Sequence, residues 1–370
     1  SSGGDPQRTI SPPLLETTVT LVVGVLSFNN SGRAARRQWI RRLSDPGSTS
    51  RIFFALPSDQ PDEDSKLDDV LHFQVAAVDR SVTGKYLLQN AWFRFAATLP
   101  DHVLWVARMD DDAVVSGTAI ATRLIRLPMN PHLDFVVYGP FRNWYMWHPQ
   151  SMQAVCWDYS PVLWFNTRRA SPPARAGTSA NAGSRPAKTF VHECMRPGVE
   201  GPYPFASGPF VAYSRRVAAL LVGLLKEDEA YVLGERRQRQ LTNVKTGYLA
   251  NRSSRSHPSR RIFMEEIYYA YLLFREWRNA TSSALGRGLV LVDEPMTEIH
   301  SRNGVYPATS HITQHHYIFH KLRYASHFAL LANSSILRMG REQRPPAMHC
   351  HALNAKWALV MKRAMRSQGL

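Results

Sequence analysis

Three consecutive aspartates, Asp110, Asp111 and Asp112, follow an apolar stretch that reads Val-Leu-Trp-Val-Ala over Val103–Ala107. Carboxylates crowded at the exposed end of a buried strand repel one another unless a cation lies among them. A hard divalent ion is usually held by one or two carboxylates and completed by the phosphate oxygens of a substrate. The triplet therefore predicts a metal site that handles a nucleotide, with an acidic turn facing solvent as the alternative.

Two further acids, Glu265 and Glu266, begin a helical pattern that includes the apolar residues Ile267, Tyr271 and Leu272. A carboxylate at the edge of a cleft can serve as a general base that accepts the proton of an attacking hydroxyl group. Acids in the first turn of a helix are also favoured by the helix dipole, which is the purely structural alternative.

Three more segments carry residue types that could bind a sugar ring, a diphosphate or a metal ion. Segment Tyr203–Phe210, with Gly208 near its end, combines a tight backbone with aromatic rings, as in a sugar-binding wall or an ordinary turn. Arg37 and Arg41 are four residues apart, so they lie on one face of a basic helix and can meet a diphosphate. His320, at the end of a strand-like Tyr-Ile-Phe stretch, is either a structural histidine or a metal ligand.

The elements that must position these residues alternate regularly from Val19 onward. Expected strands are Val19–Phe28, Arg51–Pro57, His72–Val78, Val103–Met109, Asp134–Gly139, Gly288–Val292 and His315–His320; expected helices are Arg33–Leu43, Ser65–Leu71, Gly84–Leu99, a helix capped by Ser214, Phe263–Trp277 and Lys321–Leu331. This alternation predicts an α/β fold with a mostly parallel sheet and helices on both faces. Ligands of such sheets bind beyond the carboxyl ends of the strands, where the aspartates lie.

Composition excludes a disordered chain and favours anionic partners. The 370 residues are 44% hydrophobic and carry a formal net charge of +16. Eight Lys or Arg residues accompany a single acid over residues 235–261. No helix-turn-helix, zinc-finger spacing or aromatic ribonucleoprotein motif accompanies them, so nucleic acid is not an expected partner.

We expect a polar, proline-bearing tether over residues 1–18, one catalytic domain over 19–332 and a basic extension over 333–370. Residues 170–188 and 235–261 are expected insertions within that domain. The apolar stretches are far shorter than the roughly 20 residues that cross a bilayer. Membrane attachment is therefore expected only through an anchor that precedes this sequence.

Two features bear on the compartment. Four N-x-[ST] triplets, which begin at Asn29, Asn251, Asn279 and Asn333, favour a secretory route. The three cysteines have no metal-ligand spacing and allow at most one disulfide.

Taken in order, these segments resemble the inverting β1,3-glycosyltransferases of glycosyltransferase family 31, which include galactosyl- and N-acetylglucosaminyltransferases and the fringe enzymes. The similar motifs are Ser27 followed by Arg37-x-x-Ile40-Arg41, the aspartate triplet, Tyr-Pro-x-x-Ser-Gly, Glu-Glu-Ile-Tyr and a late histidine. The family patterns are approximately S…R-x-x-I-R-x-T-W, D-D-D-V, Y-P-x-Y-x-S-G-G-G-Y and E-D-V-Y-x-G. The resemblance covers residues 19–331, most of the chain.

The resemblance implies a GT-A fold that binds a UDP-sugar through a divalent ion, usually Mn²⁺ and alternatively Mg²⁺. It implies inverting transfer of a sugar, galactose first and N-acetylglucosamine next, to the 3-hydroxyl of a glycan acceptor. By position, Glu266 is the implied base, Asp112 and His320 are the implied metal ligands, Tyr203 and Glu265 are implied acceptor contacts, and the implied donor contacts are Ser27, Arg37, Arg41, Asp110, Asp111 and Gly208.

Several positions depart from the family pattern. Leu43 and Ser44 replace Thr-Trp, Pro209 and Phe210 replace glycines, and Glu266 stands where aspartate is usual. These changes resemble the kinetoplastid phosphoglycan β1,3-galactosyltransferases, whose anionic acceptors would suit a basic enzyme. The resemblance also implies a type II membrane protein of the Golgi or secretory lumen. The alternatives are a catalytically silent glycan-binding protein on the same scaffold and a polyanion-binding module.

Overall fold

The computed structural model describes residues 15–28, 31–44, 47, 49–58, 66–75, 82–141, 143–149, 153–158, 198, 200–206, 209–225, 265–278, 289–293, 299–301 and 318–320. The chain divides into two compact units. The first comprises residues 1–141, 206–225 and 276–356, and the second comprises residues 142–205, 226–275 and 357–370.

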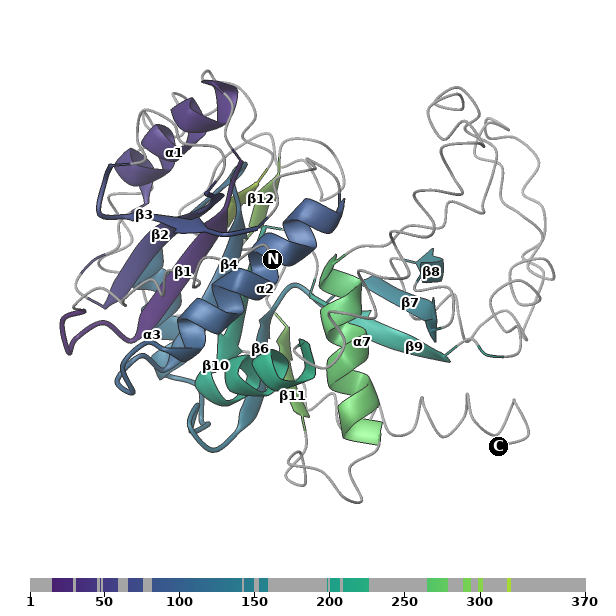
Figure 1. The fold of residues 1–370 in the computed structure, drawn as a ribbon. Helices are drawn as coiled ribbons and strands as arrows, with labels where there is room; N and C mark the ends of the chain where they lie inside the picture. The colour runs from purple at the N-terminus through teal and green to yellow at the C-terminus, as the bar shows by residue number, and fades with distance from the viewer. Residues whose placement is uncertain are drawn as a thin grey trace, which may run out of the picture. The chain divides into compact units, whose positions relative to one another are not determined.

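A seven-stranded sheet forms the centre of the first unit (Figure 1). Its strands are β1 (Leu21–Leu26), β2 (Ser50–Pro57), β3 (Val70–Phe73), β4 (Trp105–Asp110), β6 (Phe135–Gly139), β10 (Phe210–Ser214) and β11 (Leu289–Asp293). The strand order is β11-β6-β10-β4-β1-β2-β3. Strand β10 runs antiparallel to β4 and β6, and the other neighbouring pairs are parallel.

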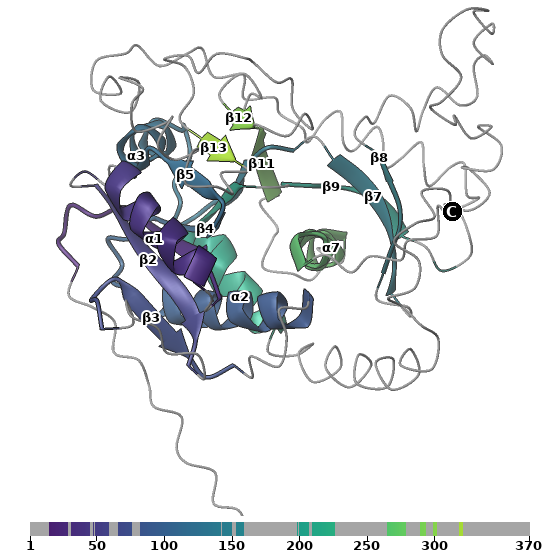
Figure 2. The ribbon, with the colours of Figure 1, turned by 90° about the horizontal axis from the view of Figure 1, so that it is seen from above.

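Helices cover both faces of this sheet, as Figure 2 shows from above. Helices α1 (Ser31–Leu43) and α3 (Gly117–Ile125) lie on one face, and α2 (Val82–Ala97) and the helical run 215–225 lie on the other. The expected fold class is therefore confirmed. The chain has an α/β fold with a Rossmann-like, mostly parallel central sheet, which fits the GT-A type.

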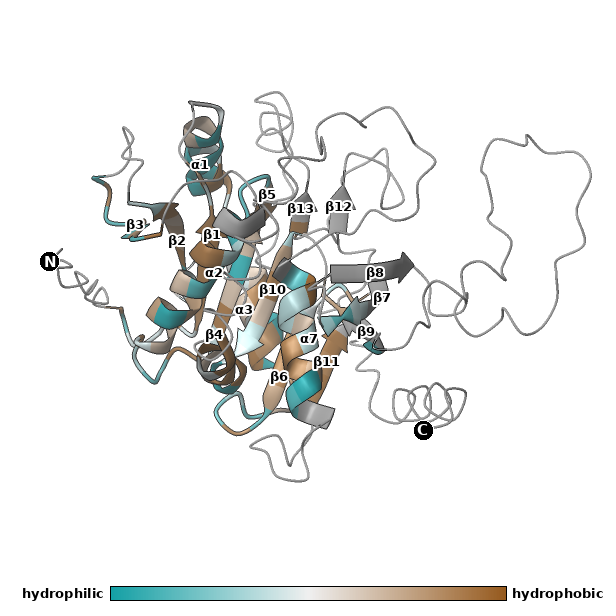
Figure 3. Cartoon of the chain, turned by 45° about the vertical axis from the view of Figure 1, so that its right-hand side comes forward, coloured by the Kyte–Doolittle hydropathy of each residue, from teal (hydrophilic) through white to brown (hydrophobic). Residues whose placement is uncertain are grey.

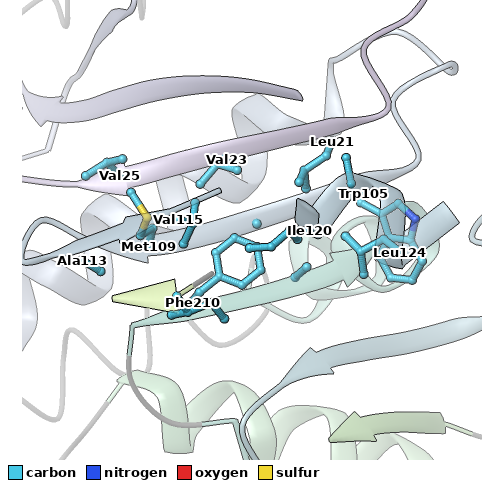
Figure 4. Close-up of a cluster of buried hydrophobic side chains, with 14 of the residues drawn as sticks. Leu21, Val23, Val25, Trp105, Met109, Ala113, Val115, Ile120, Leu124 and Phe210 are labelled. Atoms are coloured by element: carbon cyan, nitrogen blue, oxygen red, sulfur yellow. The ribbon is translucent and has the colours of Figure 1, made fainter. Parts of the chain in front are cut away.

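The core explains the strongly apolar strands. All six residues of β1 are buried, as are all five of β6 and of β10, because strands covered on both faces need apolar side chains on both. Figure 3 shows much of β1 and β6 in brown, the hydrophobic end of the scale. On the α1 and α3 face, Val23 and Val25 of β1 pack in one cluster with Ile120 and Leu124 of α3 (Figure 4).

On the α2 face, a glycine lets a tryptophan approach the sheet. A Cβ atom at Gly24 of β1 would lie 2.3 Å from Cε2 of Trp92. The indole Nε1 of Trp92 donates a hydrogen bond to the carbonyl of Ala107 in β4, at 3.1 Å. Trp92 is fully buried, so α2 is fixed over β1 and β4 by one large side chain.

The expected cap at Ser214 is confirmed. Its hydroxyl accepts from the backbone N–H of Val217, at 3.4 Å, in the first turn of the helical run 215–225. The next residue, Arg215, donates from its guanidinium to the carbonyls of Ala96 and Ala97 at the end of α2, at 2.7 and 3.0 Å. These bonds satisfy carbonyls that the helix itself leaves unpaired.

The first unit also contains a three-stranded sheet that begins directly after the aspartates. Strand β5 (Ala113–Val115) pairs antiparallel with β13 (Ile318–His320), and β13 pairs parallel with β12 (Ile299–Ser301). Helix α3 follows β5 and is capped by Ser116, whose side chain accepts from the N–H of Ala119. Neither β5 nor α3 was predicted from the sequence.

The second unit contains a sheet of β8 (Gln153–Asp158), β7 (Asn143–His148) and β9 (Glu200–Phe205), in that order. Both pairs are antiparallel. Helix α7 (Glu265–Arg278) packs on Trp147 of β7, whose ring lies 5.4 Å from that of Tyr271 and 5.7 Å from that of Tyr268.

One expected element is wrong. Residues 66–69 form turns, and β3 begins at Val70, where a helix was expected over Ser65–Leu71. The tertiary context decides this segment, because Val70 pairs with Phe54 of β2 and both side chains are buried.

The expected tether up to residue 14, both insertions, the helix over Lys321–Leu331 and the basic C-terminal extension lie outside the described residues. None of the helices in the described part of the chain combines the length and apolar character needed to span a membrane.

Replacing Gly24 with alanine should destabilise the first unit by about 1–3 kcal/mol, because the added methyl group collides with the buried ring of Trp92. The matched control is Gly223→Ala in the helical run 215–225, where a Cβ atom meets nothing within 4 Å. That change should raise the free energy of unfolding by about 1 kcal/mol, since glycine disfavours a helix interior. Urea unfolding followed by circular dichroism measures both, and equal effects of the two variants would contradict the packing described for Trp92.

Candidate active site

The register of two parallel strands brings the first candidate residues together. Leu26 at the end of β1 pairs with Asp110 at the end of β4. The residues that follow, Ser27 and Asp111, therefore emerge side by side at the carboxyl edge of the sheet. This is the edge at which open α/β sheets bind their ligands.

Asp111 is the centre of a polar cluster at this edge. Its carboxylate accepts hydrogen bonds from Ser27 Oγ at 3.0 Å, Arg33 Nη1 at 2.6 Å and Arg36 Nη1 at 3.4 Å. The residue is only 6% exposed. Asp111 thus joins the end of β1, the first turns of α1 and the end of β4 through one buried carboxylate.

Burial raises the pKa of the Asp111 carboxyl above its ordinary value of 3.8, and this effect outweighs the opposing ones. The positive charges of Arg33 and Arg36 and the hydrogen bond from Ser27 lower the pKa, while the negative charge of Asp110 raises it. A carboxyl group whose ionisation is opposed by its surroundings, at the ligand-binding edge of a sheet, is typical of a functional site.

Arg37 is a buried neighbour of this cluster. It is fully buried, and its Nη1 donates to Ser27 Oγ at 3.1 Å and to the carbonyl of Phe28 at 3.4 Å. A chain of hydrogen bonds therefore runs from Arg37 through Ser27 to Asp111. The structure brings together these three residues of the predicted donor site.

Arg41, the second arginine of the predicted pair, has different partners. Its Nε and Nη2 donate to the two carboxylate oxygens of Asp69, at 2.7 and 3.0 Å, and its guanidinium lies 4.5 Å from the ring centroid of Phe54. In this arrangement Arg41 fixes α1 to the turn before β3. A contact between Arg41 and a nucleotide remains a prediction.

Asp110 is held on the other side of the triplet. Its backbone N–H donates to the carbonyl of Pro209 at 3.2 Å, and its Oδ1 lies 3.5 Å from Nη1 of Arg108. Residues two apart in a strand share a face, and Arg108 pairs in register with Gly24, which faces α2. The ion pair between Arg108 and Asp110 therefore lies on the α2 face, whereas Asp111 is bound by residues of α1.

Two functional candidates were not predicted from the sequence: Arg33 and Arg108. Arg33 precedes Arg37 by the same four-residue spacing that singled out Arg37 and Arg41. Arg108 precedes Asp110 by the two-residue spacing that places side chains on one face of a strand. Both spacings were legible signals, but neither tells which partner a long side chain reaches.

These arginines supply positive charge that was expected to come from a metal ion. The expectation was that crowded carboxylates need a cation among them, and guanidinium groups supply positive charge beside both Asp110 and Asp111. Charge repulsion within the triplet therefore does not require a metal by itself. A metal at Asp112 remains a prediction.

Asp112 lies in the turn between β4 and β5 and is partly buried. The backbone of His320 in β13 pairs with that of Ala113, the residue after Asp112, so the topology brings the predicted histidine next to the triplet. The side chain of His320 lies outside the described residues. Among the side chains that the structure describes, no group of three or more His, Cys, Asp and Glu could hold a metal ion. One carboxylate and one imidazole fit an ion whose remaining ligands come from a substrate and water.

The remaining predicted residues belong to other parts of the chain. Glu266 lies in the first turn of α7 in the second unit and is partly buried. The backbones of Glu265 and Tyr203 are placed in α7 and β9, while their side chains are outside the described residues. Gly208 is outside them altogether. The predicted roles of these four residues are therefore not tested.

No protein-family model matches the chain, and no curated protein matches it in sequence. The chain is similar in structure to the bifunctional glycosyltransferase WbbM in its apo form, with a TM-score of 0.37 and 11% identity, over 90% of this chain and 53% of WbbM. It thus spans about half the length of WbbM.

Two further solved structures are similar over most of their length. One is a glycosyltransferase involved in the glycosylation of the major capsid of PBCV-1, with a TM-score of 0.34 and 9% identity over 85% of this chain and 99% of that one. The other is mouse xyloside xylosyltransferase 1 in its apo form, with a TM-score of 0.35 and 11% identity over 82% and 97%. Likeness at this level carries no argument about activity, so the site rests on its own residues.

Asp111→Asn should be at least as stable as the wild type at neutral pH, because it removes a charge whose burial is unfavourable. An acid with a raised folded pKa contributes stability that is complete below its unfolded pKa and is lost as the pH rises through the folded pKa. The stability difference between the two proteins should therefore shrink as the pH falls towards 3.8. Urea midpoints over that range measure it. A less stable Asn variant at neutral pH would mean that Arg33 and Arg36 outweigh burial.

Proposed function

We propose that this chain is a metal-dependent glycosyltransferase that acts on a UDP-sugar. It transfers the sugar, galactose first and N-acetylglucosamine next, to the 3-hydroxyl of a glycan acceptor with inversion, which forms a β1,3 linkage. The observation that carries the proposal is the cluster of Ser27, Arg33, Arg36 and Asp111 at the carboxyl edge of a Rossmann-like sheet. Asp112 and the backbone of His320 lie next to this cluster along β5.

The cluster has the charges that a nucleoside diphosphate needs. Arg33 and Arg36 are buried for most of their length, yet their side chains remain 24% and 23% exposed. Each can bind a phosphate oxygen while it stays paired with Asp111. Helix α1 begins at Ser31, a few residues after the end of β1, so its partly positive N-terminus adds to the attraction for an anion.

Asp111 and Ser27 then act as the frame of the donor site. The carboxylate of Asp111 holds two guanidinium groups in one place, so little side-chain freedom is lost when the diphosphate binds. Arg37, behind Ser27, fixes the hydroxyl group that completes this frame. The side chain of Asp110 is 27% exposed, so its carboxylate can accept a hydrogen bond from a hydroxyl of the donor.

Asp112 and His320 would hold the divalent ion. When bound, such an ion offsets the negative charge that grows on a departing diphosphate. The arginines of the cluster act on the same charge from the protein side, in a site that excludes part of the solvent.

Glu266 is the proposed base. Its carboxylate accepts the proton of the acceptor hydroxyl as the hydroxyl oxygen forms a bond to the anomeric carbon, and the bond from that carbon to the diphosphate oxygen breaks. One displacement inverts the anomeric carbon, so an α-linked donor gives a β-linked product. Tyr203 and Glu265, which like Glu266 belong to the second unit, are proposed acceptor contacts. The net charge of +16 would favour an anionic acceptor.

The location of the protein is a proposal as well. A sugar transfer of this kind suits the Golgi or secretory lumen, which agrees with the four N-x-[ST] triplets in the sequence. Glycan binding without turnover is the alternative. An assay of UDP release separates the two functions. A transferase releases UDP when an acceptor and a competent base are present, whereas a protein that only binds glycans does not.

Asp112→Ala should reduce the affinity for UDP in Mn²⁺ by at least about tenfold, to the level that the wild type shows in EDTA. The loss is expected because a divalent ion bound here would lose the carboxylate that Asp112 supplies. Isothermal titration calorimetry measures the affinities. Asp101→Ala, an exposed aspartate before the opposite end of β4, is the matched control and should bind UDP normally. Unchanged affinity of Asp112→Ala would remove the ion from this position.

Glu266→Gln should bind the UDP-sugar like the wild type but transfer it about 10²–10⁴-fold more slowly, because the amide cannot accept the hydroxyl proton. Glu276→Gln in the last turns of the same helix is the control. Turnover is followed by UDP release over a panel of glycan acceptors. Normal turnover by Glu266→Gln would assign the base to another carboxylate, with Glu265 the first to test.

A further inference from the structure

We infer that Arg108 is a positioning residue for the donor site: its buried guanidinium holds one oxygen of Asp110 and thereby directs the other towards a hydroxyl of the sugar nucleotide. The inference rests on the proposed function and adds a residue to it. Arg108 itself touches no ligand, because it is 1% exposed.

The neighbouring strands limit the space around the side chain of Arg108 on the α2 face. On the α2 face its neighbours in register are Gly24 in β1 and Val211 in β10, which is buried. The space above Gly24 is filled by the ring of Trp92. The side chain therefore follows its own strand towards the carboxyl edge, where Nη1 reaches to 3.5 Å from Oδ1 of Asp110.

The burial of the two partners is unequal, and this inequality separates a positioning role from a purely structural one. The side chain of Arg108 is 1% exposed, whereas that of Asp110 is 27% exposed. A buried guanidinium that serves stability alone gains little, because a well-packed apolar side chain in its place is often as stable or more stable. The buried charge of Arg108 is therefore best explained by its effect on Asp110, the exposed partner of the ion pair.

The contacts of Asp110 orient its carboxylate. The backbone N–H of Asp110 donates a hydrogen bond to the carbonyl of Pro209, and Oδ1 forms an ion pair with Nη1 of Arg108 at 3.5 Å. A carboxylate has two oxygens, so Oδ2 remains to accept a hydrogen bond from a hydroxyl of the ribose or the sugar. Because the rotation of the carboxylate is restricted before the donor arrives, less freedom is lost on binding.

The experiment is a double-mutant cycle on Arg108→Met and Asp110→Asn, with the affinity for UDP-galactose in Mn²⁺ measured by calorimetry. Arg108→Met keeps the length of the side chain and removes the charge. It should lower the affinity about 10- to 100-fold in the wild type, the range seen when the support of a binding group is removed. In the Asp110→Asn background the same change should have almost no further effect, since the oxygen that Arg108 orients has already been altered.

Two further variants separate positioning from folding. Arg108→Lys keeps the charge but not the fork of donors, and should lose less affinity than Arg108→Met. Arg123→Met removes another buried arginine, in the last turn of α3, and should leave the affinity unchanged. Urea unfolding of Arg108→Met should show a fold that is no less stable than the wild type.

The outcomes are distinct. An equal loss of affinity from Arg108→Met with and without Asp110→Asn, or no loss at all in a wild type that binds UDP-galactose, overturns the role of Arg108 and leaves the proposed function intact. A wild type that binds no sugar nucleotide with any divalent ion overturns the proposed function, and the role of Arg108 with it.

Discussion

A single carboxylate held almost entirely out of water, that of Asp111, organises the carboxyl edge of the central sheet. It exists there because β1 and β4 are parallel neighbours in a register that makes Ser27 and Asp111 leave the sheet together. Its burial is unfavourable for the charge, and Arg33 and Arg36 of α1 come to it as partners. The position of α1, and of any anion near its first turns, thus depends on this one group.

The same physics divides the acidic triplet between two faces of the sheet. Asp111 is bound by arginines from α1, and Asp110 by Arg108 from the α2 side. Alternation along a strand makes this separation automatic, since neighbouring residues point to opposite faces. Arginines therefore lie beside two of the three carboxylates, which reduces the repulsion within the triplet.

Much of this edge was legible in the sequence. Apolar runs with turn residues between them located β1, β4 and β6, and Ser214 was identified as a helix cap. The triplet was placed correctly at the end of β4. The four-residue spacing of Arg37 and Arg41 was also read correctly as one helical face, but Arg41 extends to Asp69 and Arg37 to Ser27. A pattern of spacing fixes the face of an element and leaves the partner of a flexible side chain undetermined.

Other elements escaped prediction for physical reasons. Strand β5 has three residues, too few for a periodic signal, and it exists because β13 pairs with it from far along the chain. Helix α3 begins with Gly117 and Thr118, which have poor helix propensity. The capping residue Ser116 was its main sequence signal, and this signal was not used. These two elements directly follow Asp112, so the proposed metal ligand was chosen from residue type alone, and the elements beside it were not predicted.

The most direct test of the account is a crystal of the chain grown with UDP and Mn²⁺ and measured at the manganese absorption edge. We predict an anomalous peak bonded to the Asp112 carboxylate and to the diphosphate of UDP, with Arg33 or Arg36 at the same phosphates. A manganese peak bound to UDP at any place other than the carboxyl ends of β1 and β4 would contradict it.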